Sequence, residues 1–281
     1  MMYTKSSASA RRIAEVIETE QDLTVKSQDD FPPVNTDAHI KFDNVRFSYA
    51  GGQDDLSGIS FEVKRGGSLG IIGATGSGKT TLISLLMRFY DVQGGAVYIN
   101  GRDIRTYPHK LFHEMFGVAM QSDFIYSATI EENIRFGRDL SREQIVNAAK
   151  IAQAHDFISA FDDGYEHMLS QKGTNVSGGQ RQRILIARAV AANPQILVLD
   201  DSSSALDYKT DAGLRRALSE SMSDSTIITV AQRVSSVKNC DVILVLDEGR
   251  IIGHGTHEQL LVQCGEYREI SQSQMGGDFV E

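Results

Sequence analysis

The sequence predicts an α/β fold with a parallel sheet covered by helices on both faces, and three observations predict it. Apolar runs of strand length occur at Ile196–Leu199, Thr226–Val230 and Val242–Leu246, and helical patterns alternate with them. Such continuous runs are typical of strands buried on both faces. A glycine-rich loop at residues 73–80 lies between a further apolar run, Ser68–Ile72, and a helical pattern. Strand, glycine loop and helix in this order are the context of a phosphate site.

The loop reads Gly-Ala-Thr-Gly-Ser-Gly-Lys-Thr, a complete G-x-x-x-x-G-K-[ST] pattern. Glycines let the backbone turn its N–H groups inward, and the helix N-terminus adds partial positive charge. Lys79 is expected to reach the β- and γ-phosphates, and the Thr80 hydroxyl to join a Mg²⁺ shell. The pattern therefore predicts a P-loop NTPase core that binds a nucleoside triphosphate. The expected contact residues are Gly73, Ala74, Thr75, Gly76, Ser77, Gly78, Lys79, Thr80 and Thr81.

The N-terminal part begins with a helical pattern and then changes to strand patterns. The helical stretch covers roughly residues 8–20, and a polar linker ends at Pro32-Pro33, which indicates a domain boundary near residue 36. Residues 39–49 alternate with period two and predict a strand. Further strands are predicted at Ile59–Val63 and Ala96–Gly101.

Helical patterns dominate the middle of the chain. The pattern changes to helices from about Ala128 to Gly179, clearest over Glu131–Ile134 and Ser141–Phe161, and a helical run follows at Ile184–Ala192. Near the C-terminus, Thr256 and Gln259 have the spacing of a capping box, which predicts a last helix.

Composition excludes several classes. The chain has 281 residues, of which 41% are hydrophobic, so it can bury a large core. Its longest apolar runs are far shorter than a membrane span, and the residues after Arg11 and Arg12 are too charged for a secretory signal. The formal net charge of −9 argues against nucleic acid as a partner. Cys240 and Cys264 have no metal or redox spacing and are expected to be reduced thiols.

Two further features complete the site pattern. Asp200 ends the Ile196–Leu199 run, where a carboxylate facing a phosphate loop is expected to hold Mg²⁺. Upstream, Ser177-Gly178-Gly179-Gln180 precedes a helical run, so a hydroxyl, free N–H groups and a helix dipole are offered to a phosphate.

Together these motifs resemble the nucleotide-binding domain of an ABC transporter over roughly residues 37 to 270. Ser177–Gln180 is similar to the family's signature, Gln121 to its Q-loop, residues 204–207 to its D-loop, and Tyr49 to the aromatic residue that stacks on adenine. The resemblance implies a RecA-like P-loop core with an N-terminal antiparallel β-subdomain and a helical subdomain at about residues 122–181. It implies ATP and Mg²⁺ as cofactors, with the metal held by Thr80, Gln121 and Asp200. The signature residues Ser177, Gly178, Gly179 and Gln180, with Asp207, are implied to contact nucleotide.

In this family two such domains pack head to tail, and each signature closes over the ATP held by the other. The resemblance therefore implies a second ABC nucleotide-binding domain as partner, with ATP between the two.

Two positions depart from the family pattern. Asp201 stands where the family usually has a catalytic glutamate, and Gln232 stands where it usually has a switch histidine. With Lys79, these are the expected catalytic residues. The pairing resembles the degenerate subunit of heterodimeric exporters, whose partner carries the usual residues. Harmless drift in a homodimer with slow hydrolysis is the alternative.

Other segments resemble an exporter. Residues 6–23 are similar to the linker that follows the last membrane helix, and residues 124–134 to the exporter region after the Q-loop. In the loop at residues 170–173, Gln171 stands where a glutamate is usual, which leaves that loop's coupling role in doubt. The resemblance implies residues 1–36 as linker, residues 37–281 as the ATPase domain, a transmembrane domain on the full-length chain, and a place on the cytoplasmic face of the cell membrane.

Three alternatives stay open. The N-terminal helix could be a plain amphipathic cap. A soluble ABC ATPase of repair or translation would need a tandem cassette or a coiled-coil insertion, and neither is seen in the sequence. A non-catalytic ATP-binding module would bind ATP without turning it over.

Overall fold

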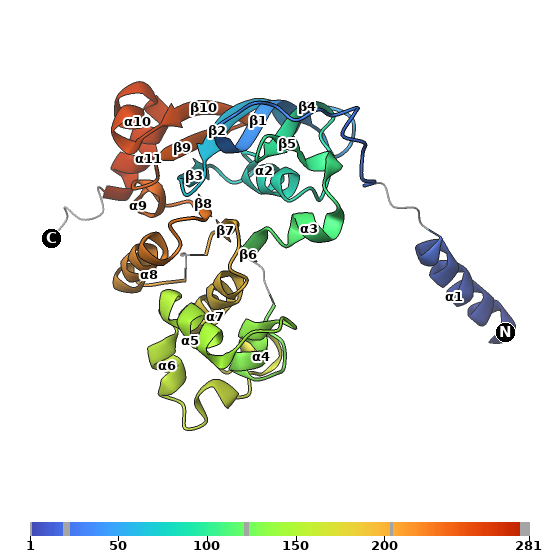
Figure 1. Cartoon of the computed structure of the whole chain (residues 1–281), viewed down its shortest axis with the longest axis vertical. Helices are drawn as coiled ribbons and strands as arrows, with labels where there is room; N and C mark the ends of the chain where they lie inside the picture. The colour runs from blue at the N-terminus through green and yellow to red at the C-terminus, as the bar shows by residue number, and fades with distance from the viewer. Residues whose placement is uncertain (1, 19–22, 121–123, 203–204, 276–281) are drawn as a thin grey trace.

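Two β-sheets organise the protein, and helices surround them (Figure 1). The structure is a computed structural model that describes residues 2–18, 23–120, 124–202 and 205–275. The larger sheet has the strand order β10-β9-β3-β8-β7-β6 and is parallel from β9 to β6, with β10 antiparallel at its edge. Its strands are β3 (Ser68–Gly73), β6 (Phe116–Ala119), β7 (Ile196–Asp200), β8 (Thr226–Val230), β9 (Val242–Asp247) and β10 (Arg250–Gly255). The predicted parallel α/β core is confirmed.

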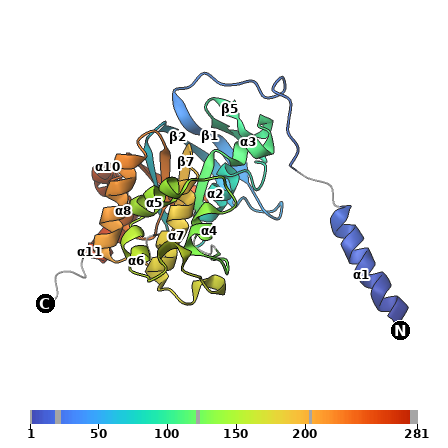
Figure 2. The same cartoon turned by 60° about the horizontal axis from the view of Figure 1, so that its bottom comes forward.

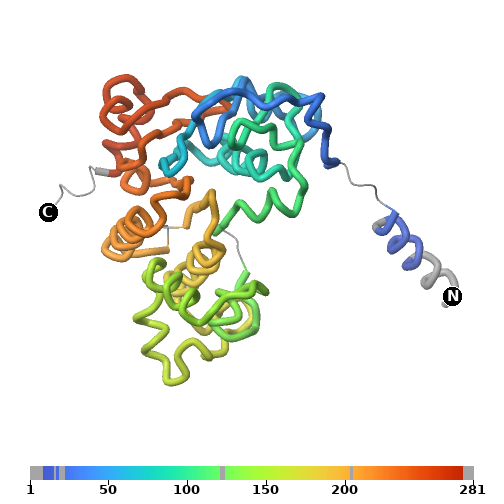
Figure 3. Tube along the Cα trace, viewed as in Figure 1, coloured from blue at the N-terminus to red at the C-terminus, as the bar shows by residue number. Residues whose placement is uncertain are grey.

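The smaller sheet is antiparallel and comes from the N-terminal part of the chain. Its order is β2-β1-β4-β5, formed by β1 (Ala38–Phe47), β2 (Leu56–Lys64), β4 (Gly94–Ile99) and β5 (Arg102–Asp103). The C-terminal segment, red in Figure 3, runs beside these N-terminal strands. There the Ser57 N–H donates to the Gly249 carbonyl at 2.9 Å. The expected antiparallel β-subdomain is therefore present and attached to the core sheet.

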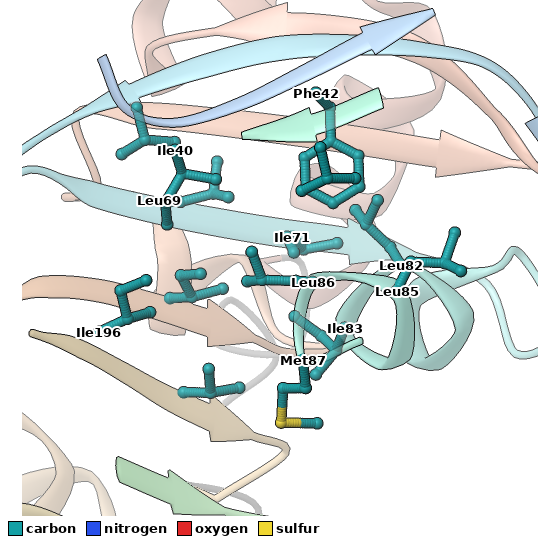
Figure 4. Packing of buried hydrophobic residues seen from close by; sticks show 14 of the residues in the cluster. Ile40, Phe42, Leu69, Ile71, Leu82, Ile83, Leu85, Leu86, Met87 and Ile196 are labelled. Carbon is teal, nitrogen blue, oxygen red and sulfur yellow. The ribbon is translucent and has the colours of Figure 1, made fainter. Parts of the chain in front are cut away.

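One hydrophobic core joins the two sheets to helix α2 (Lys79–Leu86), as Figure 4 shows. Phe42 of β1 stacks on Phe61 of β2 with ring centroids 4.7 Å apart. Leu82 and Leu85 of α2 are fully buried against these strands. Each such side chain contributes about 1.5–3 kcal/mol when fully buried. The core therefore fixes the helix that begins at the glycine-rich loop.

A second core lies at the lower end of the molecule in Figure 1. It is formed by α4 (Ile130–Arg135), α5 (Arg142–Ile151), α6 (His155–Ser159) and α7 (Gly178–Ala191), with the short 3₁₀ turns η2 (Gly164–Glu166) and η3 (Gln171–Gly173). The helical pattern over residues 141–161 forms two helices, because Gln153 adopts a left-handed conformation (φ 56°) that separates α5 from α6.

The helix α1 (Met2–Ile17) lies apart from the rest of the molecule in both Figure 1 and Figure 2. Ile13 and Ile17 are largely exposed on it. The sequence pattern predicted this helix but began it six residues late. Among the residues described, none of the helices has the length and apolar character that a membrane crossing requires.

Several elements carried too weak a pattern to be predicted. They are β6, β10, α3 (His109–His113), α8 (Tyr208–Ser221), α9 (Val234–Val237) and α11 (Gly265–Met275). Helix α8, for example, buries only Asp211, Leu214 and Leu218, so its apolar stripe is narrow. The predicted capping box is confirmed at α10 (His257–Gln263), where Thr256 Oγ accepts from the Gln259 N–H.

Candidate functional site

The glycine-rich loop joins β3 to α2 and needs glycine at specific positions. Gly78 precedes α2 with φ 101°, and Gly76 has φ 84°. A Cβ on Gly73 would lie 2.2 Å from the Leu246 carbonyl oxygen, and one on Gly78 would lie 2.7 Å from a Leu56 methyl carbon. Positive φ values and close backbone approach favour glycine strongly. The loop therefore keeps the tight curve that turns its N–H groups toward an anion.

The Lys79 ammonium lies over this loop. Its Nζ donates to the carbonyl of Gly73 at 2.8 Å and to that of Ala74 at 2.7 Å. Burial lowers the pKa of Lys79 below its ordinary value, while the Asp200 and Asp201 carboxylates oppose that shift. The structure therefore brings the loop lysine and both strand-end carboxylates within electrostatic reach of one another.

The other loop residues divide by exposure. Ala74, Thr75, Gly76 and Thr80 are exposed, so their backbone and the Thr80 hydroxyl are accessible to a ligand. The buried Ser77 Oγ has no hydrogen-bond partner among the residues that the structure describes. Thr81 is mostly buried and accepts a long hydrogen bond, 3.4 Å, from the Tyr49 hydroxyl. A loop of this shape, with an exposed N-terminal turn and one half-buried cation, fits a polyphosphate.

Asp200 ends strand β7 and Asp201 follows it, at the sheet edge where the loop follows β3. Asp200 is 8% exposed, and burial, together with the charge of Asp201, raises its pKa. Burial also raises the pKa of Asp201, and the cations Arg233 and Lys79 partly offset this. Adjacent carboxylates at a buried strand end favour a divalent cation, because its charge relieves their repulsion.

This carboxylate arrangement suits Mg²⁺ better than a metal with an all-protein ligand set. No three His, Cys, Asp or Glu side chains within the described ranges gather into a metal-binding group. Mg²⁺ typically takes one or two carboxylates and completes its shell with water and substrate phosphates. Asp200 and the exposed Thr80 hydroxyl are the described groups that could hold it.

Tyr49 follows β1, two residues beyond its last residue, Phe47. Its ring meets those of Phe47 and Tyr90 edge-to-face, at centroid distances of 4.9 and 5.1 Å. The Tyr49 N–H donates to Asp55 at 2.9 Å, which fixes the backbone. With about half of its surface exposed, the ring offers a supported face to a planar ligand.

The switch position lies at the end of β8. Gln232 and Arg233 are both exposed there, next to Asp201 across the sheet. The sequence interpretation did not single out Arg233, whose cation opposes the rise that burial causes in the pKa of Asp201. Nothing in the sequence spacing marks this electrostatic interaction, because residues 201 and 233 are brought near each other only by the pairing of β7 with β8.

The structure does not bring the Ser177–Gln180 segment to this loop. That segment begins α7, in the lower part of Figure 1, whereas the loop begins α2 in the upper part. Ser177 caps α7 in a capping box with Gln180, and Ser177 and Gly178 are exposed. The first N–H groups of a helix have no intrahelical acceptor. Gly178 and Gly179 therefore offer theirs to a group outside the helix.

Asp207 caps a different helix, α8. Its carboxylate accepts from the Thr210 N–H at 2.9 Å and from the Thr210 hydroxyl at 2.8 Å. These bonds hold the pKa of Asp207 below its usual value. Two expected residues, Gln121 and Ser204, lie outside the described residues.

Comparison with known proteins shows the family of the chain. The sequence model of the ABC transporter family matches residues 56–204. The chain belongs to the ABC transporter family. The ABC transporter ATP-binding protein YknU of Bacillus subtilis is 42% identical over 277 residues, which are 96% of this chain and 46% of that protein. ATP-binding cassette sub-family B member 6 of Xenopus tropicalis is 42% identical over 239 residues, 85% of this chain and 28% of that protein.

A solved structure adds the fold. A bacterial Atm1-family ABC exporter with ATP bound superposes with a TM-score of 0.87 at 33% identity, over 99% of this chain and 48% of that chain. This ABC chain is therefore a nucleotide-binding domain of the exporter type, and domains of its family bind ATP with Mg²⁺. It spans less than half the length of these relatives.

Proposed function

We propose that this ABC domain binds ATP, hydrolyses it slowly at its own site, and completes the active site of a partner. Lys79 and Thr80 hold phosphate and Mg²⁺, Asp200 and Gln121 hold Mg²⁺, and Tyr49 stacks on adenine. Asp201 and Gln232 occupy the catalytic positions in weakened form.

The observation that carries the proposal is the position of Asp201. Its backbone N–H is tied to the Val230 carbonyl at 2.9 Å, and its φ is 48°. The backbone cannot advance to compensate for a short side chain. A carboxylate one methylene shorter than glutamate reaches about 1.5 Å less far, and a misplacement of about 1 Å costs on the order of 10²-fold in rate. Asp201 is therefore a weak base for the attacking water.

Gln232 is a second cause of slow hydrolysis. Its amide can donate a hydrogen bond to a γ-phosphate but cannot become cationic as charge develops in the transition state. The charge of Arg233 beside it only partly offsets the burial that raises the pKa of Asp201. The two weakened positions lie at the ends of neighbouring strands, β7 and β8, so they affect one half-site.

The exposed signature segment supports the proposal that a partner domain binds there. Ser177 and Gly178 lie at the surface, and their helix α7 is far from the chain's own loop (Figure 1). An anion-binding helix end that serves no local phosphate is suited to the phosphate held by another domain. We propose a head-to-tail dimer with a second ABC domain, from a different half-transporter with the usual Glu and His.

Exposed apolar side chains support a further partner, the transmembrane domain of the full-length chain. Phe89, Tyr90 and Leu111 are 44–59% exposed on the core, and Phe124 and Tyr126 are 53–59% exposed beside α4. The loop that contains Gln171 packs on the same segment, since the Lys172 N–H donates to the Ile125 carbonyl at 3.1 Å. Exposed large apolar side chains that gather in this way are typical of an interaction surface.

This arrangement gives the domain organisation that we propose. Residues 1–36 link the ATPase domain, residues 37–281, to the membrane helices. The helical subdomain spans about residues 122–181. The protein acts at the cytoplasmic face of the cell membrane and couples ATP turnover to export.

Complementation between two variants tests the division of labour. The first variant, Asp201→Glu with Gln232→His and Gly178→Arg, has a repaired catalytic site but a blocked signature. A Cβ at Gly178 would meet only the Ala205 Cβ, at 3.9 Å, so this change is compatible with the fold. The second protein is the wild-type chain, which has the intact signature.

Each protein alone should release phosphate slowly, and their mixture should be at least tenfold faster, because a well-placed general base is worth about 10²–10⁴-fold. The matched control replaces the wild-type chain in the mixture with Gly178→Arg alone and should remain slow. A mixture no faster than its components would contradict the proposal.

A further inference from the structure

The C-terminal helix α11 holds the switch segment through one side chain. The Gln274 Nε2 donates to the Gln232 carbonyl at 2.8 Å, and the Gln274 Oε1 accepts from the Val234 N–H at 2.8 Å. Both ends of one amide therefore bind the backbone on the two sides of Arg233. This bond pair joins residues 40 and 42 positions apart in the sequence.

The segment that Gln274 holds has few other ties. Ala231 and Val234 are buried, at 3% and 2% exposure, whereas Gln232 and Arg233 between them are exposed. The Ala231 N–H pairs with the Ile71 carbonyl at 3.0 Å, which is the last link to the sheet. Beyond it, two ties fix the peptide groups that carry the two exposed side chains: the Gln274 amide, and the Ser236 N–H, which donates to the Arg233 carbonyl at 3.1 Å.

Helix α11 is itself firmly anchored, so it can act as a support. Tyr267 is completely buried and its hydroxyl bonds to the His257 ring nitrogen Nδ1 at 2.8 Å. Tyr267 belongs to one apolar cluster with Ala231, Val234 and Leu260. Figure 1 shows α11 beside α9, which begins at Val234. Helix α11 and the segment from Ala231 to Val234 thus pack into the same apolar cluster.

We propose that Gln274 is a positioning residue for ATP hydrolysis, and that α11 sets the place of the switch side chains through it. The proposal rests on the function proposed above, because it assumes that Gln232 faces the γ-phosphate. Gln232 and Arg233 can act on phosphate and on Asp201 only if their backbone stays in place. A shift of about 1 Å in such a group costs on the order of 10²-fold in rate.

Three substitutions separate hydrogen bonding from packing. Gln274→Met keeps the length of the side chain and loses both bonds. Gln274→Glu keeps the acceptor for the Val234 N–H but loses the donor to the Gln232 carbonyl. Gln272→Ala, on an exposed position of the same helix, is the matched control.

Two measurements on the 281-residue chain test the proposal. The first is single-turnover ATP hydrolysis. The second is hydrogen exchange of the Val234 amide, which reports on its hydrogen bond to Gln274 independently of activity. For Gln274→Met we expect at least a fivefold lower rate, an ATP affinity within twofold of wild type, and exchange at Val234 at least tenfold faster. Gln274→Glu should keep Val234 protected but still lose rate, and Gln272→Ala should match wild type in both.

The outcomes distinguish this proposal from the function on which it rests. If Gln274→Met hydrolyses ATP and protects Val234 as Gln272→Ala does, the positioning role is refuted while the proposed function stands. If the wild-type chain does not bind ATP, the proposed function fails. Faster exchange at Val234 in Gln274→Met would then show only that Gln274 holds the backbone in place, and the role of Gln274 in hydrolysis would be overturned.

Discussion

The backbone N–H of Asp201 donates to the carbonyl of Val230 at 2.9 Å, so the carboxylate that we propose as a weakened catalytic base is fixed to the strand that leads into Gln232. Strands β7 and β8 pair in parallel up to this point, and both end at the same edge of the sheet. The two departures from the family pattern, 31 positions apart in the sequence, are therefore one local change in space. A variant that corrects only one of them leaves the other in the same half-site.

Lys79 tests the phosphate-binding role of the loop. Lys79→Ala removes a cation whose hydrogen bonds to a charged phosphate are worth about 1.5–3 kcal/mol, so ATP affinity should fall about 10- to 150-fold. Lys150→Ala, on the exposed face of α5, is the matched control and should bind as wild type does. Calorimetric titration with Mg-ATP measures both, and equal affinities for the two variants would remove Lys79 from the site.

Tyr49 tests the adenine-stacking role. Tyr49→Ala should weaken ATP binding by about 1–2 kcal/mol, because the ring supported by Phe47 and Tyr90 is lost. Tyr49→Phe keeps the ring and loses only the 3.4 Å hydrogen bond to Thr81, so it should bind ATP within about twofold of wild type. If Tyr49→Ala binds ATP as tightly as Tyr49→Phe, the base stacks elsewhere.

Gly76 and Gly78 form a matched pair for backbone strain. Both have positive φ, but a Cβ on Gly76 meets no atom within 4 Å, whereas one on Gly78 meets a Leu56 methyl carbon at 2.7 Å. We expect Gly76→Ala to lower the free energy of unfolding by about 1 kcal/mol and Gly78→Ala by at least about 2 kcal/mol. Urea unfolding measures the difference, and equal losses would contradict a steric conflict between the added Cβ and Leu56.

His39 predicts loss of stability in acid. It is 2% exposed, its Nδ1 lies 2.6 Å from the Thr226 hydroxyl, and burial, with the nearby Arg65 charge, lowers its pKa from 6.5 to about 4. The unfolded chain therefore binds a proton between these pH values that the folded chain does not. Above pH 6.5 His39 therefore does not reduce the free energy of unfolding, and this free energy falls as the pH drops from 6.5 toward 4.

The size of this effect can be measured by urea unfolding. The linkage predicts a loss of about 2 kcal/mol by pH 5 and about 3 kcal/mol by pH 4. Other groups also titrate in this range, so His39→Gln is the control. Between pH 7.5 and pH 5, the fall in its unfolding free energy should be about 2 kcal/mol smaller than the fall in wild type. The same slope in both proteins would show that His39 is not held neutral.

The sequence could predict the parts of the site that depend on local pattern. The loop, its flanking strand and helix, and Asp200 at the end of a buried strand follow from apolar periodicity and from the rule that parallel strands end at one edge. The Thr256 capping box was equally local and is confirmed.

Contacts made by tertiary packing left no such pattern. The break between α5 and α6 depends on a left-handed Gln153, and glutamine does not signal that conformation. The electrostatic influence of Arg233 on Asp201 and the bonds of Gln274 to the Gln232 and Val234 backbone join residues brought together only by the folded core. Edge strand β10 alternates between exposed and half-buried residues, so it lacked the apolar run of the central strands.

The central claim is that this domain's own site is catalytically weak because of Asp201 and Gln232. The most direct measurement is steady-state phosphate release at high protein concentration, comparing the wild-type chain with Asp201→Glu/Gln232→His. The signature Ser177–Gln180 is intact in both, so a homodimer of the double variant has both halves of a working site. A general base in place is worth about 10²–10⁴-fold, so the double variant should be at least tenfold faster. If the double variant is no faster than wild type, Asp201 is already a competent base and the claim is wrong.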